Sequence, residues 1–309
     1  MLPLLDHLSG RYQSGQALAQ RLGVSRTAVW KQALALRAQG YPVETQRGWG
    51  YRLAPGSPTP QALEALREGR FGAFYAYLGT VESTQEVLKG WALDGAEEGA
   101  VVLAERQLKG RGRRGRTWIS GSGKSLTFSV LLRPTLPLSA LALIPLVAGL
   151  ALREAVGVGG LKWPNDLLAP DGRKLAGILL EAQVSGEEVA YVLLGVGLNV
   201  HQAPGLPPEA AALAEFVEVS RVEVLARFLS RLEARYAELH RNPQGFLLDY
   251  KALSCTLGRP VRVQTPQGEV RGVATDLSPD GSLVVEGQGQ TCQIGAGDVE
   301  LIGYAGGVP

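Results

Sequence analysis

The chain has 309 residues, enough for two or three domains with at least one large hydrophobic core. A formal net charge of +2 excludes a protein coated in nucleic acid, so any DNA contact must come from a local patch. Two cysteines and three scattered histidines give neither a disulfide framework nor a metal-ligand spacing. We therefore expect a cytoplasmic protein with no metal ligands of its own. We also expect no cleavable leader, because Asp6 interrupts the short apolar run after Met1.

The first 53 residues predict three helices followed by a hairpin. Gly23 provides a turn between a helix over 15–22 and a helix over 26–39 that Ser25 caps, which is the helix-turn-helix pattern. The hairpin over 43–53 then stands in the position of a wing. These features predict a winged helix-turn-helix domain over residues 1–53.

A basic excess in this segment favours DNA binding. Seven arginine or lysine residues occur there against two carboxylates, a net charge of +5 in a chain of +2. We expect Arg26, Lys31 and the wing residue Arg47 to contact operator DNA. The alternative of a module used only for protein contacts stays open, because the helix over 26–39 has few basic residues.

Residues 54–60 (APGSPTP) predict a linker, since three prolines and a glycine leave little apolar content. Beyond it we expect a helix over 61–69, a strand near 74–78 and a helix that begins after Ser83, Thr84 and Gln85. The two hydroxyls are equally suited to capping that helix and to binding a ligand.

The segment GRGRRGR, residues 110–116, alternates three glycines with four arginines between two apolar strands expected over 100–106 and 125–132. Four guanidinium groups so close should repel one another and keep the loop open until a polyanion binds, while glycine lets the backbone close over the ligand. The alternative is a solvated basic loop. A dinucleotide fingerprint is excluded because no helix follows and no acidic residue occurs between Arg106 and Arg153.

Residues 134–152 contain no charge and reach the length of a membrane span. Three prolines, a glycine and many alanines interrupt this run, so we expect a buried helix over about 139–155 and no membrane association.

Two further motifs follow, KWPND at 162–166 and RKLAGILL at 173–180. The first predicts a turn, and the second a strand in which Gly177 permits close approach of a ligand or another backbone. We expect another strand over 189–200, which contains Asn199, helices over 222–239 and 245–253, and short alternating strands from Leu257 onward. Those strands predict a small β-barrel.

With these three motifs in one order, behind a winged helix and ahead of a small barrel, the chain resembles the bifunctional biotin protein ligases that also repress transcription. The resemblance implies an α+β chain in three parts: the winged helix, a mixed-sheet catalytic domain of the biotin/lipoate ligase type over 61–256, and an SH3-like barrel over 257–309. It implies that biotin and MgATP give biotinyl-5′-adenylate, and that the acyl group passes to a lysine of a biotin carboxyl carrier protein. It also implies a homodimer promoted by ligand.

The resemblance assigns roles to individual residues. Lys174 would reach the biotin carboxylate and the α-phosphate, and Arg113 would close over the adenylate. Asp166 would hold a magnesium water or attract the acceptor lysine, and both roles stay open. The implied biotin contacts are Ser83, Thr84, Gln85, Gln107, Arg111, Gly112, Arg113 and Lys174. The implied adenylate contacts are Gly110, Arg111, Gly112, Arg113, Arg114, Gly115, Arg116, Trp118 and Asn199.

Three points of the resemblance stay open. Gln85 stands where relatives often have asparagine, and Trp118 fits either a wall over the ligand or a core position. Relatives carry an arginine in the last barrel strand where this chain has Leu301 and Ile302, so the role of the barrel is undecided. The alternatives to a biotin ligase are a lipoate or octanoate ligase of the same fold and a biotin-sensing repressor without transferase activity.

Overall fold

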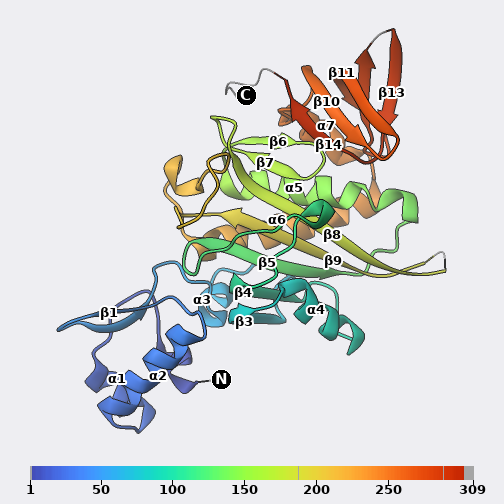
Figure 1. The fold of residues 1–309 in the computed structure, drawn as a ribbon. Helices are drawn as coiled ribbons and strands as arrows, with labels where there is room; N and C mark the ends of the chain where they lie inside the picture. Colours follow the sequence, from blue (N-terminus) through green and yellow to red (C-terminus); the bar gives the residue numbers. More distant parts are fainter. Residues whose placement is uncertain (1, 187, 288, 303–309) are drawn as a thin grey trace.

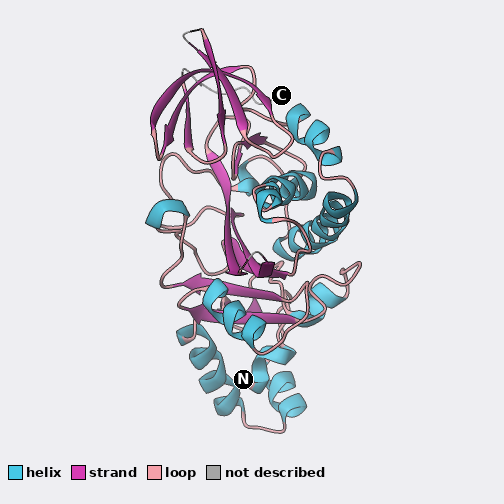
Figure 2. Ribbon diagram, turned by 90° about the vertical axis from the view of Figure 1, so that its right-hand side faces the viewer, coloured by secondary structure: helices cyan, strands magenta, loops and turns pink. Residues whose placement is uncertain are grey.

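The computed structural model describes residues 2–186, 188–287 and 289–302. Three parts follow one another along the chain: a winged helix, a central mixed sheet with helices, and a small β domain (Figures 1 and 2). The winged helix and the β domain lie at opposite ends of the molecule, with the central sheet between them. The expected α+β fold class is confirmed.

The winged helix consists of η1 (Pro3–His7), α1 (Gly15–Leu22), α2 (Arg26–Ala38), β1 (Val43–Gln46) and β2 (Gly50–Leu53). Ser14 and Ser25 cap α1 and α2 by accepting hydrogen bonds from backbone N–H groups, and Gly23 makes the turn at a φ of 64°. The first expected helix is only a 3-10 turn, because Leu8 adopts an extended backbone and ends it.

The segment expected to be a linker is packed against the central part of the molecule. Ser57 Oγ accepts a hydrogen bond of 3.0 Å from Arg221, and the Tyr75 hydroxyl donates one of 2.6 Å to the Pro58 carbonyl. Thr59 caps α3 (Pro60–Glu64), which is shorter than the expected helix over 61–69. Hydrogen bonds therefore fix this connection, and Ser57, Pro58 and Thr59 within it are buried.

The central sheet has seven strands in the order β3-β4-β5-β9-β8-β7-β6, and only β3 and β4 run parallel among these strands as described. They are β3 (Tyr75–Val81), β4 (Val101–Gln107), β5 (Ser125–Leu132), β6 (Gly160–Lys162), β7 (Asp166–Leu168), β8 (Lys174–Ser185) and β9 (Glu188–Asn199). The sheet is therefore mixed, as expected.

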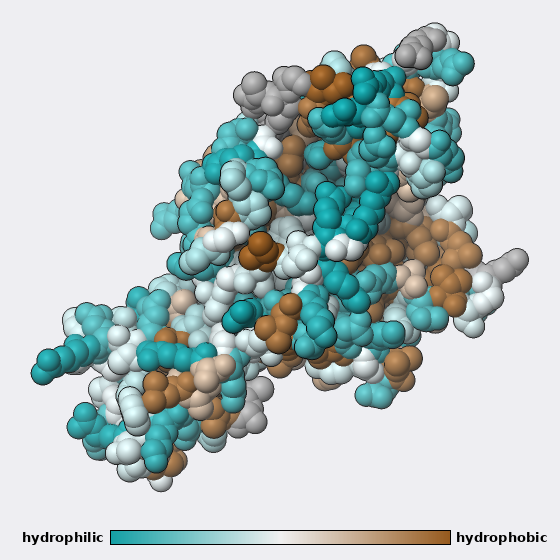
Figure 3. Space-filling model, viewed as in Figure 1, coloured by the Kyte–Doolittle hydropathy of each residue, from teal (hydrophilic) through white to brown (hydrophobic). Residues whose placement is uncertain are grey.

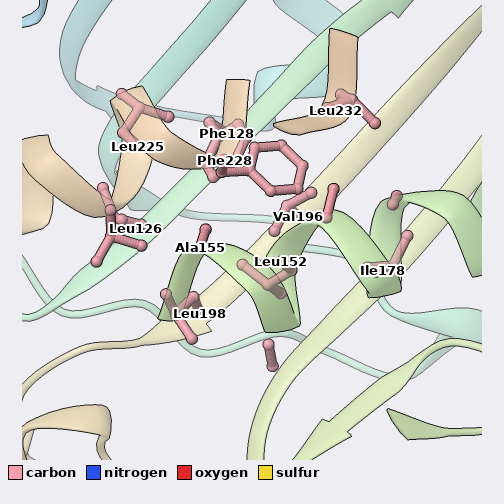
Figure 4. Close-up of a cluster of buried hydrophobic side chains, with 14 of the residues drawn as sticks. Leu126, Phe128, Leu152, Ala155, Ile178, Val196, Leu198, Leu225, Phe228 and Leu232 are labelled. Atoms are coloured by element: carbon pink, nitrogen blue, oxygen red, sulfur yellow. The ribbon is translucent and has the colours of Figure 1, made fainter. Parts of the chain in front are cut away.

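Each face of this sheet packs against different helices. On one face, α5 (Leu143–Val156), α6 (Arg221–Arg241) and α7 (Gly245–Ala252) cover the side chains that alternate inward, such as Phe128, which meets Phe228 at 5.2 Å (Figure 4). On the other face, α4 (Thr84–Leu93) buries Leu88 against Val102 and Leu131. Only part of this second face is covered by a helix, and the remainder is available to form a site.

The apolar segment Leu138–Val156 is long and apolar enough to cross a membrane by composition alone. Within the fold, 67% of its most apolar window is buried, and it packs as η3 (Leu138–Ala140) and α5 against the sheet and α6. It is the core helix that the sequence predicted.

The C-terminal domain is an antiparallel five-stranded sheet in the order β13-β12-β11-β10-β14. Its strands are β10 (Arg259–Thr265), β11 (Gly268–Leu277), β12 (Leu283–Gly287), β13 (Gln290–Ile294) and β14 (Asp298–Leu301). Residues 303–309 of the expected C-terminal domain lie outside the described residues. The pairing of β14 with β10 brings Asp298 to one edge of the domain, which bears on the site below.

Candidate active site

Three strands that present small residues make the floor of a cavity on the open face of the central sheet. Thr127 on β5 lies opposite Gly197 on β9, and Gly197 lies opposite Gly177 on β8. In the next row, Ser129 lies opposite Gly195. Because side chains alternate along a strand, these residues face the cavity while their neighbours face the α5–α6 core. The cavity has a volume of about 280 Å³.

One end of the cavity carries the predicted hydroxyl and amide groups. Thr84 Oγ1 lies 2.8 Å from Ser129 Oγ, and both the N–H and the hydroxyl of Thr84 donate to Gln107 Oε1, at 2.7 and 3.1 Å. Gln85 donates from its amide to the Leu193 carbonyl at 3.2 Å. Ser83 occupies the cap position of α4 but makes no capping hydrogen bond with its side chain. The hydroxyl pair therefore does not cap the helix, and it lines the cavity instead.

The other end of the cavity carries a lysine and an aspartate. The register of β7 and β8 places Asp166 opposite Gly177, and Lys174 Nζ lies 2.7 Å from Asp166 Oδ1. Lys162 Nζ is 4.0 Å from the other Asp166 oxygen, and the Asn199 amide donates to the Lys174 carbonyl at 3.4 Å. The ammonium is thus held beside a carboxylate that a ligand anion can replace.

Carboxylates already neutralise the arginines of the loop. Arg111 pairs with Glu86 at 2.9 Å and with Glu181 at 3.1 Å. Arg113 donates to Asn165 Oδ1 at 2.9 Å, and burial lowers the pKa of its guanidinium. The expectation that mutual repulsion holds this loop open was wrong, because its counter-ions are carboxylates from segments distant along the chain, such as Glu181.

The C-terminal domain provides the remaining counter-ion. Asp298 lies 3.6 Å from Arg113, 3.4 Å from Arg114 and 3.0 Å from Arg116. The Gly297 carbonyl also accepts a hydrogen bond of 3.1 Å from Arg113. The sequence left the contribution of the C-terminal domain to the site undecided. In the structure, this domain at least holds the arginine loop in place.

Trp118 lies on the glycine floor. A methyl group at Gly197 would overlap its ring, and one at Gly177 would lie 3.4 Å from it and 3.2 Å from Lys174 Nζ. The neighbours of Gly177 are thus the side chains of Lys174 and Trp118, and the close approach of a ligand or another backbone expected there stays a prediction. The indole covers part of the floor, and the cavity is smaller than the roughly 300–1,000 Å³ of typical ligand pockets.

Most of the predicted site residues line this one cavity. The exceptions are Gly110, Arg114 and Gly115, which belong to the loop but do not line it. Among the residues that the structure describes, Arg114 is the one residue other than glycine with a positive φ, which is 54°. The loop backbone is therefore strained at the point where Arg114 turns toward Asp298.

Sequence reasoning missed the floor itself. The alternation of Ser125, Thr127 and Ser129 within an otherwise apolar strand was a readable signal, and so was the alternation of Gly195 and Gly197 before Asn199. Both patterns place small or polar residues on one face of a strand, which is unusual for the centre of a sheet.

The expected DNA contacts lie in the winged helix, apart from the cavity. Arg26, Lys31 and Arg47 are exposed and make no side-chain hydrogen bond or ion pair among the described residues, whereas Arg52 pairs with Glu44 at 2.7 Å. Figure 3 shows hydrophilic surface at the projecting end of the β1–β2 hairpin. These three cations are free to meet phosphate.

Within the described part of the chain, no group of three or more histidine, cysteine, aspartate or glutamate residues could hold a metal ion. Asp166 is the carboxylate closest to Lys174 in the cavity. A single carboxylate suits Mg²⁺, which keeps several waters and is usually carried on substrate phosphates.

Three family models match the chain in the order of its three parts. Residues 4–52 match an HTH domain, residues 77–199 match the biotin/lipoate A/B protein ligase family, and residues 256–302 match the biotin protein ligase C-terminal domain. The matched ranges contain the winged helix, the cavity floor and the Asp298 edge respectively.

Comparison with individual proteins agrees with these models. The chain is 33% identical to the bifunctional ligase/repressor BirA of Bacillus subtilis over 97% of both chains. It is 40% identical to the biotin–[acetyl-CoA-carboxylase] ligase of Mycobacterium tuberculosis over 70% of this chain and 85% of that one. A biotin protein ligase from Aquifex aeolicus, solved with biotin and ATP, superimposes with a TM-score of 0.63 and 31% identity, covering 74% of this chain and 97% of that chain. This chain therefore belongs to the family of bifunctional biotin protein ligases and repressors.

Proposed function

We propose that this protein activates biotin with ATP and transfers it to a lysine of a biotin carboxyl carrier protein. The observation that carries the proposal is one cavity with hydroxyl and amide groups at one end and Lys174 with the arginine loop at the other. Hydroxyl and amide groups suit a cyclic urea, which both donates and accepts hydrogen bonds. Cations suit the carboxylate of the same molecule and the phosphates of a nucleotide.

The first step joins two anions and needs charge neutralisation rather than a base. The biotin carboxylate is ionised at neutral pH, so its oxygen attacks the α-phosphorus directly and pyrophosphate leaves. Lys174 turns from Asp166 toward the carboxylate and α-phosphate oxygens, and Arg113 closes over the adenylate. Mg²⁺ would supply further neutralisation of the phosphates, with Asp166 as the protein carboxylate that holds one of its waters.

The second step transfers the acyl group. The acceptor lysine, as the free amine, attacks the acyl carbon of the mixed anhydride, and AMP leaves with the bonding electrons. Asp166, once released from Lys174, can instead attract the acceptor ammonium and take its proton. The closed loop excludes water, which would otherwise hydrolyse the anhydride.

The winged helix supports a second activity, binding of operator DNA as a biotin-responsive repressor. Arg26, Lys31 and Arg47 provide unpaired positive charge on the exposed face of α2 and at the hairpin. In this proposal, adenylate promotes a homodimer. The dimer binds DNA more tightly than the monomer, because two winged helices on a two-fold operator double the phosphate contacts. Both activities take place in the cytoplasm.

Incubation of the purified protein with ATP, labelled biotin and a carboxyl carrier domain tests the ligase. We expect label on the carrier, and none when lipoate or octanoate replaces biotin. Labelling by lipoate or octanoate instead would support an acyl ligase of the other specificity. Biotin binding without any labelling of the carrier would leave a biotin-sensing repressor.

A further inference from the structure

Two buried polar atoms on the cavity floor have no hydrogen-bond partner among the described residues: Thr127 Oγ1 and Trp118 Nε1. Both atoms lie beside Gly197. Gly197 is the cross-strand neighbour of Thr127, and Trp118 Nε1 lies 2.6 Å from where a Cβ of Gly197 would be. Burying a polar group without a partner destabilises the folded state, so both atoms indicate a site where a ligand group can form a hydrogen bond.

The other hydroxyls on this face of β5 are satisfied within the protein. Ser125 Oγ accepts a hydrogen bond of 3.2 Å from the Gly121 N–H, and Ser129 Oγ lies 2.8 Å from Thr84 Oγ1. Thr127 is only 3% exposed and differs from them in having no such partner. Valine has the same shape and would occupy this position without an orphaned hydroxyl, so folding alone does not account for threonine here.

The predicted ureido contacts are short of acceptors. A ureido group presents two N–H donors and one carbonyl oxygen. Gln107 Oε1 already accepts two hydrogen bonds from Thr84, which fills both of its lone pairs, and the Gln85 amide nitrogen donates to two backbone carbonyls. Of these two amides, only the Gln85 oxygen is left as an acceptor, so the second ureido N–H needs an acceptor from elsewhere.

We propose that the Thr127 hydroxyl accepts a hydrogen bond from a ureido N–H of biotin, at the place that the Trp118 indole covers in the free protein. This inference rests on the proposed function. Thr127 and Ser129 are two residues apart on one strand, about 7 Å. A cyclic urea with a hydrogen bond of about 2.9 Å at each nitrogen fits between two oxygens at close to this separation. Trp118 leaves the floor when the ring enters and then lies over it.

The variant Thr127→Val removes the hydroxyl and keeps the shape, and Thr127→Ser keeps the hydroxyl. Calorimetric titration with biotin should give an affinity about tenfold weaker for the valine variant, and close to wild type for the serine variant. Desthiobiotin, which lacks the sulfur but keeps the ureido ring, should show the same weakening. The thermal midpoint of the free valine variant should be unchanged or higher, because the hydroxyl has no partner to lose.

Ser129→Ala is the contrasting variant. It removes a hydroxyl that already has a partner, Thr84, as well as the second oxygen at the ring, so it should lower both the biotin affinity and the thermal midpoint of the free protein. Wild-type protein that does not bind biotin would contradict the proposed function itself. Wild-type protein that binds biotin, with a valine variant that binds it equally well, would overturn the role of Thr127 alone. The role would also be overturned if affinity and free-protein stability fell together, or if desthiobiotin showed no weakening.

Discussion

Lys174 and Asp166 form a contact that a substrate can exchange. Their side chains are 34% and 17% exposed and lie 2.7 Å apart, and the two residues begin β8 and β7 respectively. In the proposed mechanism, the ion pair holds the ammonium at the cavity, and Lys174 turns from Asp166 to the carboxylate and phosphate oxygens when these bind.

Lys174→Ala should leave biotin affinity within a few-fold of wild type, since the ureido contacts lie at the other end of the cavity. Adenylate formation should fall about a hundredfold or more, because the charge-assisted bonds of the ammonium, each about 1.5–3 kcal/mol, are lost. Calorimetry measures the first quantity and pyrophosphate release the second. Lys162→Ala, which removes the more distant cation at 4.0 Å, should keep most activity. Pyrophosphate release at the wild-type rate from the Lys174 variant would remove this residue from the mechanism.

At the scale of elements, the arginine loop is held between the central sheet and the C-terminal domain. Arg111 reaches back to Glu86 and Glu181, whereas Asp298 serves Arg113, Arg114 and Arg116. The counter-ions of the loop therefore come from both sides. In the proposed function the loop acts as a lid, and a bound nucleotide phosphate would compete with these carboxylates for the same guanidinium groups.

Arg113→Gly should still form adenylate but retain it poorly, because the lid loses the guanidinium that lines the cavity. An escaped mixed anhydride acylates any amine that it meets, so we expect labelling of a bystander such as albumin. Arg114→Gly is the control, since Arg114 does not line the cavity and glycine tolerates its φ of 54°. Albumin labelling no greater than that of wild type would show that Arg113 does not retain the intermediate.

Asp298→Asn should loosen the lid in the free protein, because three guanidinium groups lose one shared carboxylate. Limited trypsin digestion within residues 110–116 should become several-fold faster, and biotin with ATP should restore protection by supplying phosphate. Glu300→Gln, which removes a partner of Arg262 within the same strand pair, should leave the digestion rate unchanged. Equal digestion of both variants would assign the order of the loop to other contacts.

At the scale of the whole molecule, a buried ion pair joins the central domain to the segment over 54–60 and to the turn that contacts the winged helix. Arg221 and Glu105 are both inaccessible and 2.9 Å apart. Arg221 also donates to Ser57 in the linker at 3.0 Å, and Glu105 accepts from the Gly123 N–H at 2.6 Å. The same turn reaches the winged helix, where Ser122 Oγ donates to the Gly40 carbonyl at 2.7 Å.

Arg221→Ala should destabilise the protein by about 3–5 kcal/mol, because it leaves the Glu105 carboxylate buried without its counter-ion. The thermal midpoint, followed by circular dichroism, measures this. Arg227→Ala breaks an exposed pair on the same helix, 3.5 Å from Glu223, and should change stability by less than about 1 kcal/mol. Equal midpoints for the two variants would contradict a structural role for the buried pair.

The two ends of the chain should communicate through ligand. Biotinyl-adenylate should shift the protein from monomer toward dimer in sedimentation and tighten its binding to an inverted-repeat operator. Replacing Arg26, Lys31 and Arg47 together by alanine should abolish the DNA binding and leave carrier labelling unchanged. Selection of bound DNA fragments at moderate salt identifies the operator. Failure to enrich any inverted repeat would contradict the proposed repressor activity and would leave the proposed ligase activity unaffected.

The sequence by itself determined those features that depend on local order. Helix caps such as Ser25, strand alternation and the apolar run before Arg153 depend on neighbours a few residues away, so they predicted the elements and the order of the three parts. The motifs at 110–116, 162–166 and 173–180 carried the family resemblance, which predicted Lys174, Asp166 and Arg113 as site residues.

Only the tertiary structure decided the contacts between segments distant in the chain. Asp298 is 182 residues from Arg116, and Arg221 is 116 residues from Glu105, so neither pair has a local pattern that could reveal it. The orphaned Thr127 hydroxyl became visible only when the register of β5 and β9 placed it opposite Gly197 beneath the Trp118 indole. Helix and strand propensities depend on a few neighbouring residues, whereas charge pairs and hydrogen bonds between distant segments form only when the strands are in register.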